Sequence, residues 1–229
     1  MANHMKPDKK RAILQALVEG CSVRSAERMT GAHRDSILRL LVRAGAHCEA
    51  ILDREIRDVC TNSIQCDELW TYCHTKERHL QPGDPSEWGD QYCFIALERE
   101  SKMILAHDVD KRDDVTAHRF VNTLSRRVGG PVQIFADGWA GYKTAIPRYF
   151  GARANFAQVI KNYDADSDEH RYTPPRVTSI THNWVCGAPR TGLITTSHVE
   201  RSNWNVRTYL RRFTRLSNGF SRKLANLRV

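Results

Sequence analysis

The sequence contains no hydrophobic run long enough to cross a membrane. Its longest apolar stretches, such as Cys93–Leu97, fall far short of the roughly 20 residues that a membrane helix needs. An opening signal segment is also missing, because Met1–Arg11 is polar and basic. The seven cysteines form no CxxC pair and the ten histidines do not lie near them at ligand spacing, so a zinc ribbon is excluded. We therefore predict a cytoplasmic protein with reduced, mostly buried thiols.

The charge of the chain is unevenly distributed. In 229 residues, 35 basic against 26 acidic side chains give a formal net charge of +9. Residues 1–46 hold nine basic and four acidic side chains, residues 193–229 hold eight and one, and the middle holds 18 and 21. Two basic ends around an acidic middle favour a chain that binds a polyanion with both of its terminal segments. Solvated surface charge explains the composition equally well.

The first 46 residues predict three short helices. The second and third are separated by Gly31, which makes a turn, and together they are typical of a helix-turn-helix. His33 stands where a Ser or Thr cap is more usual, and a small helical subdomain without a role in DNA binding is the alternative. The residues expected to face inward are Ile13, Leu14, Leu17, Val18, Val23, Ala26, Met29, Ile37, Leu40 and Leu41, and those expected to face outward to DNA are Arg34, Ser36, Arg39 and Arg43.

Beyond a linker at 47–62, the pattern changes to an α/β domain over 63–229. Its order of strands and helices predicts a mixed sheet with an antiparallel start and a parallel finish, flanked by helices. Residues 162–192 are polar and predict a long loop or insertion. Ser197–Arg215 predicts a strongly basic helix, with Glu200 near its start. The expected strands are Ser63–Cys66, Gln91–Leu97, Met103–Val109, Val132–Ala136 and Ala154–Ile160. One expected helix is capped by Asp114 and has Ala117, Val121, Leu124 and Val128 at helical spacing, and a second, short helix spans Gly141–Tyr149.

Three carboxylates stand where these elements could bring them together. Asp67 follows the first expected strand, Asp137 follows the strand after the long helix, and Glu200 is the one acidic residue among eight basic ones near the C-terminus. Side chains at strand ends can converge on a ligand, and carboxylate oxygens are ligands that Mg²⁺ prefers. Each residue alone is more often a turn former or a surface residue, but the three in this order predict a metal-dependent phosphodiester chemistry.

The residues around these carboxylates resemble three motifs of one family. Ile64–Trp70 resembles the first catalytic motif of insertion-sequence transposases of the DDE superfamily, IS-one family. Ala136–Tyr142 resembles the second, and Ser197–Asn203 with the basic run that follows it resembles the third. The resemblance covers nearly the whole chain, because a helix-turn-helix before the acidic core also fits.

The resemblance implies a ribonuclease-H-like fold and a transposase that cuts and joins double-stranded DNA at element ends, with Mg²⁺ or Mn²⁺ as cofactor. Asp67, Asp137 and Glu200 would be the catalytic metal ligands, and Glu68 would support them. A bacterial protein that associates with the nucleoid when bound, as a homodimer or larger assembly on DNA, is expected. The further residues expected to contact DNA are Arg201, Asn203, Arg207, Arg211, Arg212 and Arg215.

Three interpretations stay open at this point. Family members usually continue beyond the position of Val229, so a truncated, inactive remnant that only binds DNA is the alternative to an active transposase. A ribonuclease or other nuclease of the same fold is the third. We further expect Trp70, Trp139, Trp204, Tyr209 and Phe213 to pack in the core, whereas Trp184 could act as a wedge at a distorted DNA end.

Overall fold

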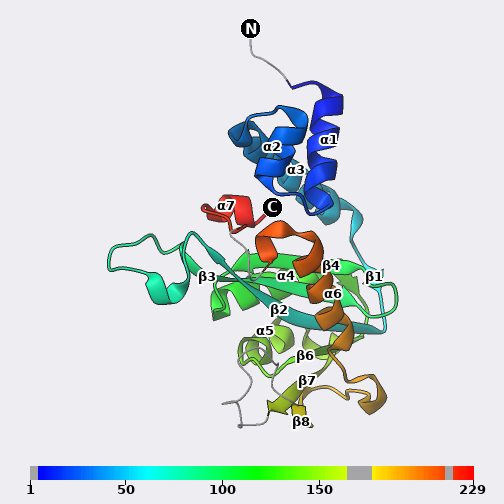
Figure 1. Cartoon of the computed structure of the whole chain (residues 1–229). Helices are drawn as coiled ribbons and strands as arrows, with labels where there is room; N and C mark the ends of the chain where they lie inside the picture. The colour runs from blue at the N-terminus through cyan, green and yellow to red at the C-terminus, as the bar shows by residue number, and fades with distance from the viewer. Residues whose placement is uncertain (1–4, 164–176, 215–218) are drawn as a thin grey trace.

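The computed structural model describes residues 5–163, 177–214 and 219–229, and its centre is a six-stranded mixed sheet (Figure 1). The strand order is β4-β3-β2-β6-β7-β8. β2 pairs antiparallel with β3, and β3 with β4, whereas β2–β6 and β6–β7 are parallel. The mixed sheet with its antiparallel start is as predicted, and so are the parallel pairs in its second half. The edge strand β8, which was not predicted, pairs antiparallel with β7, so the sheet does not finish parallel. The strands are β2 (Ser63–Cys73), β3 (Gly89–Glu98), β4 (Ile104–Asp110), β6 (Val132–Asp137), β7 (Ala154–Tyr163) and β8 (Val177–Cys186).

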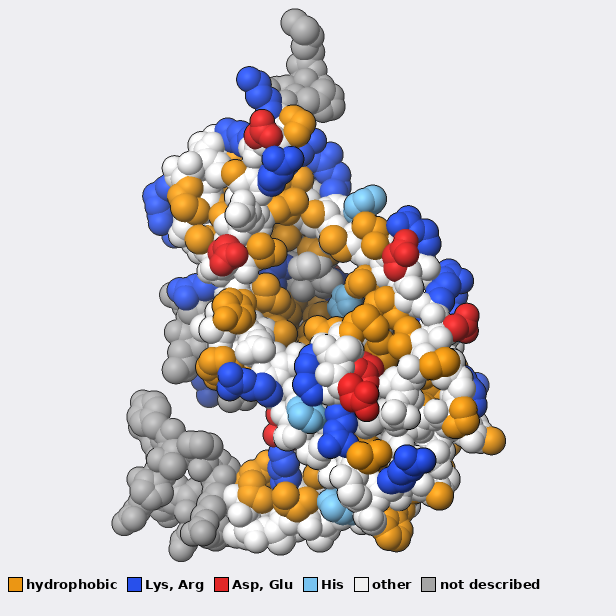
Figure 2. All heavy atoms as spheres, turned by 90° about the vertical axis from the view of Figure 1, so that its right-hand side faces the viewer, with side chains coloured by type: hydrophobic (Ala, Val, Ile, Leu, Met, Phe, Trp, Pro, Cys, Tyr) orange, Lys and Arg blue, Asp and Glu red, His pale blue; other side chains and the backbone are white. Residues whose placement is uncertain are grey.

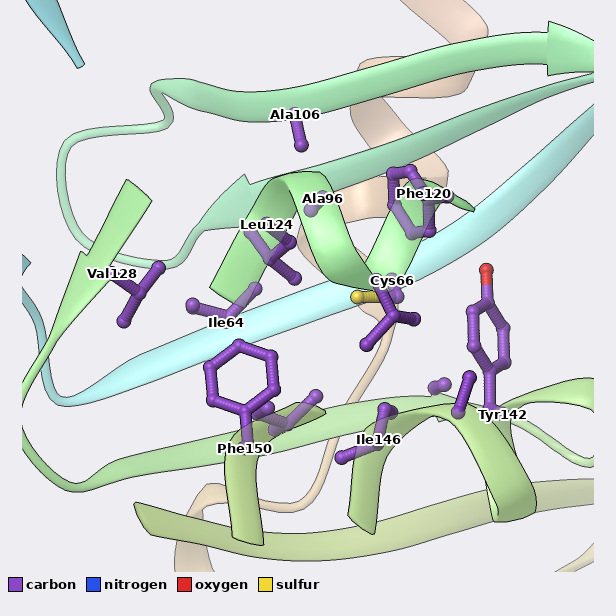
Figure 3. Packing of buried hydrophobic residues seen from close by; sticks show 14 of the residues in the cluster. Ile64, Cys66, Ala96, Ala106, Phe120, Leu124, Val128, Tyr142, Ile146 and Phe150 are labelled. Carbon is purple, nitrogen blue, oxygen red and sulfur yellow. The ribbon is translucent and has the colours of Figure 1, made fainter. Parts of the chain in front are cut away.

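One face of the sheet is covered by α4 (Asp114–Arg127) and α5 (Gly141–Phe150). Asp113 caps α4 in place of the expected Asp114, since the Asp113 carboxylate accepts a hydrogen bond of 2.8 Å from the backbone N–H of Thr116. Alternate residues of β2 and β3 meet the apolar stripes of the two helices in a closely packed cluster (Figure 3). The inward positions expected for α4 are confirmed, because Ala117, Val121, Leu124 and Val128 are all buried.

The opposite face of the sheet carries α6 (Ser197–Tyr209), a short turn η4 (Arg211–Phe213) and α7 (Leu224–Leu227). A smaller apolar cluster joins them to β2 and β3. Its sheet residues are the odd-numbered neighbours of those on the α4–α5 face, for example Leu69, Ile95 and Leu97. Each of these strands therefore serves two cores, one on each side of the sheet.

The N-terminal helices α1 (Pro7–Val18), α2 (Val23–Thr30) and α3 (Arg34–Glu55) form a separate small cluster above the sheet (Figure 1). Gly31 ends α2 in the left-handed conformation, at φ 61°, which makes the predicted turn. His33 does cap α3, since its Nδ1 accepts from the backbone N–H of Asp35 at 3.3 Å. The remaining short elements are β1 (Val59–Cys60), which pairs with β5 (Val128–Gly129), and the turns η1 (Glu77–His79), η2 (Gly151–Arg153) and η3 (Thr191–Leu193).

Four predicted boundaries are wrong. β2 continues to Cys73 instead of ending at Cys66, and α3 continues to Glu55 instead of ending near Ala44, so much of the predicted linker is helical. The predicted loop at 162–192 contains strand β8, and the basic helix ends at Tyr209 instead of Arg215. Residues 164–176 of the predicted loop lie outside the described part of the chain.

Four residues expected to be buried are exposed instead. Val18, Met29, Trp204 and Tyr209 each have more than half of their surface exposed, because they lie on the outer faces of their helices. Phe213 is buried as expected. No helix in the described residues is long and apolar enough to cross a membrane.

Candidate carboxylate site

Two adjacent carboxylates of β2 point to opposite faces of the sheet. Asp67 lies on the α6 face, where its Oδ2 accepts a hydrogen bond of 2.7 Å from the side-chain amide of Asn203. Glu68 lies on the α4–α5 face beside Tyr142, and its side chain is only 2% exposed. The prediction that Asp67 closes its strand is therefore wrong, because both residues lie inside a strand that is paired along its length with β3.

Asp137 completes a carboxylate cluster from the next strand. It is the last residue of β6, as predicted, and the parallel pairing of Cys66 with Ala136 sets it beside Asp67. One oxygen each from Asp67, Glu68 and Asp137 lies within 4.8 Å of the others. All three donors are carboxylate oxygens, and Glu68 Oε1 is buried without a hydrogen-bond partner among the described residues. Such a donor set fits a hard divalent cation such as Mg²⁺.

Glu200 lies in the first turn of α6 and lines the same cleft as Asp67 and Asp137. Its Oε1 accepts a hydrogen bond of 2.6 Å from the Thr196 hydroxyl and forms an ion pair with Lys161. It does not belong to the cluster that joins Asp67, Glu68 and Asp137. The structure thus brings the three predicted carboxylates to one cleft, with Glu68 in closer contact with the two aspartates than Glu200 is.

The clustered carboxylates are difficult to ionise together. Burial, followed by repulsion from Asp137, raises the pKa of Asp67 to about 7 and the pKa of Glu68 to about 8. Burial also raises the pKa of Tyr142 well above its usual value. Tyr142 and the Arg112 guanidinium, both beside Glu68, partly offset this rise in the pKa of Glu68.

Two cations that the sequence analysis did not select lie in the cleft. Arg112 forms ion pairs with Glu68 at 2.9 Å and Asp137 at 3.1 Å, and its guanidinium lies 4.9 Å from the centre of the Trp139 ring. Lys161, on β7, pairs with Glu200. Neither residue has a sequence signal of its own, because each meets its partner only when distant segments pack together.

Two buried glutamines, also missed in the sequence, hold the backbone of this site. Gln158 of β7 donates from its side chain to the carbonyl oxygens of Asp137 at 2.9 Å and Trp139 at 2.7 Å. Gln65 of β2 accepts hydrogen bonds from the first turn of α6. Both side chains are fully buried, at 0% exposure. They fix the segments that carry Asp137 and Glu200.

The residues expected to contact DNA fall into two groups. Those of α3 are accessible, since Arg34, Arg39 and Arg43 are exposed and Ser36 is half-buried beside Arg39. Figure 2 shows Lys and Arg side chains both over the N-terminal helices and over the lower part of the molecule.

The second group, in and after α6, is only partly accessible. Arg201 is exposed and its guanidinium lies 4.6 Å from the centre of the Trp204 ring, and Arg211 is exposed beyond the end of α6. Asn203 is buried, and its side-chain amide donates to Asp67. The others that turn inward are Arg207, which donates to the carbonyls of Trp70 and Phe213, and Arg212, which donates to those of Asn226 and Val229; Arg215 lies outside the described residues.

Comparisons with known proteins give only distant likenesses. No family model and no curated protein matches the chain. A pre-cleavage Mos1 transpososome is 13% identical with a TM-score of 0.28, over 68% of this chain and 61% of that one. A synaptic complex of piggyBac transposase with hairpin DNA is 12% identical with a TM-score of 0.34, over 91% of this chain and 46% of that one. This chain therefore spans less than two thirds of the length of either, and the likenesses carry no argument about its activity.

Proposed function

We propose that this chain is a metal-dependent DNA strand-transfer enzyme, a transposase that cleaves double-stranded DNA at the ends of an insertion element and joins it to a target. The observation that carries the proposal is the convergence of Asp67, Asp137 and Glu200, from three different elements, on one cleft. Carboxylates gathered in this way are suited to holding divalent cations against a phosphodiester.

In this proposal Asp67 and Asp137 hold Mg²⁺ or Mn²⁺, with Glu200 as the third ligand once it leaves Lys161. Bound there, the metal would supply charge neutralisation at the phosphate and lower the pKa of a water or 3′-hydroxyl. Glu68 and Arg112 act behind the aspartates, since Arg112 contacts both Glu68 and Asp137 and fixes their orientation. Because Arg112 and Lys161 line the cleft, they also offer N–H donors to phosphate oxygens.

The N-terminal helices would bind the DNA duplex at a place separate from the phosphodiester in the cleft. Arg34, Arg39 and Arg43 of α3 are exposed, as a recognition helix requires. Arg201 and Arg211, in and just after α6, are exposed as well. The two element ends must be brought together in one complex, and each end needs an active site. A homodimer or larger assembly on DNA is therefore part of the proposal.

The test is cleavage and joining of a labelled duplex that carries the DNA flanking the coding sequence of this chain. We expect products with Mg²⁺ or Mn²⁺, none with EDTA, and a loss of at least about 100-fold in Glu200→Gln and Asp137→Asn at unchanged DNA affinity. Glu100→Gln is the matched control, because Glu100 is exposed in the turn between β3 and β4. Salt-sensitive binding without product under any metal would contradict the proposal.

That negative result would support a second candidate, a protein that binds DNA without cutting it. One observation favours this candidate: Glu200 is paired with Lys161 and lies apart from the cluster of Asp67, Glu68 and Asp137. The two candidates differ in what Arg39→Gln does. Arg39→Gln weakens DNA binding in both candidates. Only in a transposase does strand cleavage fall together with DNA affinity.

A further inference from the structure

The first turn of α6 is held by an unusual partner. The first N–H groups of a helix have no acceptor inside the helix and are commonly satisfied by a capping side chain. Thr196 at the cap position makes no such hydrogen bond. Instead, the side-chain oxygen Oε1 of Gln65 accepts from the N–H groups of His198 at 3.0 Å and Val199 at 3.1 Å.

With Gln65 included, every N–H group of this turn has an acceptor. Ser197 N donates to the hydroxyl of Thr195 at 3.2 Å, and Glu200 N donates to the carbonyl of Thr196 at 3.0 Å. The N–H groups of the two residues between them, His198 and Val199, donate to Gln65. Loss of this side chain would leave two N–H groups unsatisfied, one of them the buried N–H of Val199.

Gln65 lies between the two elements that carry the proposed metal ligands Asp67 and Glu200. It precedes Asp67 by two residues on β2, so both side chains point to the α6 face. At the other end of its hydrogen bonds lies the turn that carries Glu200. One buried side chain, at 0% exposure, therefore connects the strand of Asp67 to the helix of Glu200.

Two further contacts continue this connection along α6. Asn203 donates to Asp67 at 2.7 Å, and Arg207 donates to the carbonyl of Trp70 at 3.1 Å. The contacts of Gln65, Asp67 and Trp70 therefore follow one another along β2, and their partners follow one another along α6 in the same order. Gln65 makes the contact at the Glu200 end, where the helix begins. The same turn is also joined to β7, through the contact of Lys161 with the Glu200 side chain, but only Gln65 holds its backbone to β2 among the described hydrogen bonds.

We infer that Gln65 is a positioning residue, which fixes the Glu200 turn of α6 against β2 and so sets the geometry of the metal site. The inference deepens the proposed function and rests on it for the metal. Gln65 touches neither substrate nor metal, and acts through the backbone of His198 and Val199. A residue with this role is expected to change metal affinity by about 10-fold when its acceptor is removed.

The experiment compares Gln65→Met, which removes the acceptor at similar volume, with Gln65→Glu, which keeps it. Gln91→Met is the matched control, because Gln91 is equally buried on β3 but donates to the carbonyl of Glu87, away from α6. Binding of Mn²⁺ alone to the full chain is measured from the electron paramagnetic resonance signal of free Mn²⁺. Hydrogen exchange of the His198 and Val199 amides is measured without metal.

We expect Gln65→Met to weaken Mn²⁺ binding about 10-fold and to accelerate exchange at both amides, while Gln65→Glu restores both and Gln91→Met changes neither. Should Gln65→Met fail to fold by circular dichroism, Gln65→Asn replaces it, because the shorter side chain cannot reach the helix. Unchanged exchange, unchanged Mn²⁺ affinity, or equal losses in Gln91→Met would each overturn the inference.

Failure of the proposed function gives a different result. In that case the wild-type chain binds no Mn²⁺ and cleaves no DNA, and the assignment of Gln65 to a metal site falls with it. The exchange rates at His198 and Val199 still decide whether Gln65 anchors α6 to the sheet.

Discussion

The two faces of the sheet are held to their helices by different forces. On the α4–α5 face, side chains such as Phe94, Phe120 and Leu124 are fully buried in an apolar cluster (Figure 3). On the α6 face a smaller apolar cluster is joined by buried polar contacts, in which Gln65 and Asn203 connect the helix to β2. Apolar packing is strong and tolerant of small shifts, whereas hydrogen bonds fix direction and distance. The first face therefore supplies stability, and the second positions Asp67 and the turn that carries Glu200.

The largest effect is expected from opening the apolar face. Phe120→Ala removes a fully buried ring between α4 and the sheet and leaves a cavity, so the free energy of unfolding should fall by about 3–5 kcal/mol. Urea denaturation followed by circular dichroism measures the change. Tyr209→Ala, at an exposed position of α6, is the control and should cost far less. Equal losses in the two variants would contradict the distinction between the faces.

The next effect concerns the buried charge of Asp67. A carboxyl with a raised folded-state pKa contributes its stability at low pH and loses it as the pH rises through about 7. Without metal, Asp67→Asn should therefore be more stable than the wild type at pH 8, by on the order of 3 kcal/mol, and similar to it at pH 4. Thermal unfolding in EDTA across this range checks the sign. A variant that is less stable at pH 8 would show that the ionised carboxylate is well accommodated.

Arg112 tests a charged contact beside the apolar face. Arg112→Gln leaves Glu68 and Asp137 without their cation, and should lower the free energy of unfolding by about 1–2 kcal/mol at pH 8, since the arginine is partly exposed. At pH 5 the loss should be smaller, because Glu68 with its pKa raised to about 8 is then protonated. Chemical denaturation at the two pH values measures both. A loss that does not depend on pH would assign Arg112 to packing on Trp139.

The smallest effect is expected from a single polar contact of the α6 face. Asn203→Ala removes the hydrogen bond to Asp67 and should cost about 1 kcal/mol at pH 8. A double-mutant cycle with Asp67→Asn isolates the pair, and we expect a coupling energy of about 0.5–1.5 kcal/mol. A coupling of zero would mean that Asn203 contributes only through packing.

Elements with a clear hydrophobic period were predictable from the sequence. The spacing of Ala117, Val121 and Leu124 gave α4 its inward face, and the hairpin of β3 and β4 followed from apolar runs around a charged turn. The length predicted for β2 was too short, because Asp67 and Glu68 are typical of a strand end. In the structure, pairing with β3 continues past both residues, so they lie inside the strand. β8 was missed because it is an edge strand with mostly exposed side chains, so its sequence lacks a buried face.

The candidate site was predictable only in part. The strand-end position of Asp137 and the first-turn position of Glu200 have local signals in the sequence. Glu68, Arg112 and Lys161 owe their positions to packing between distant segments, which no short pattern describes. The inward turn of Arg207 and Arg212 has the same origin, because each donates to backbone carbonyls that only the folded chain supplies.

Helix α3 acts as a rigid spacer. The three arginines expected to contact DNA, Arg34, Arg39 and Arg43, lie in its first half. Near its end, Asp53 pairs with Arg127 of α4 and Leu52 packs against the α4–α5 cluster. At a rise of 1.5 Å per residue, 22 residues span about 33 Å, close to one turn of B-form DNA. Removal of one residue would rotate the arginines by about 100° relative to the sheet. Changes in the length of this helix are therefore tolerable only in steps of about one turn.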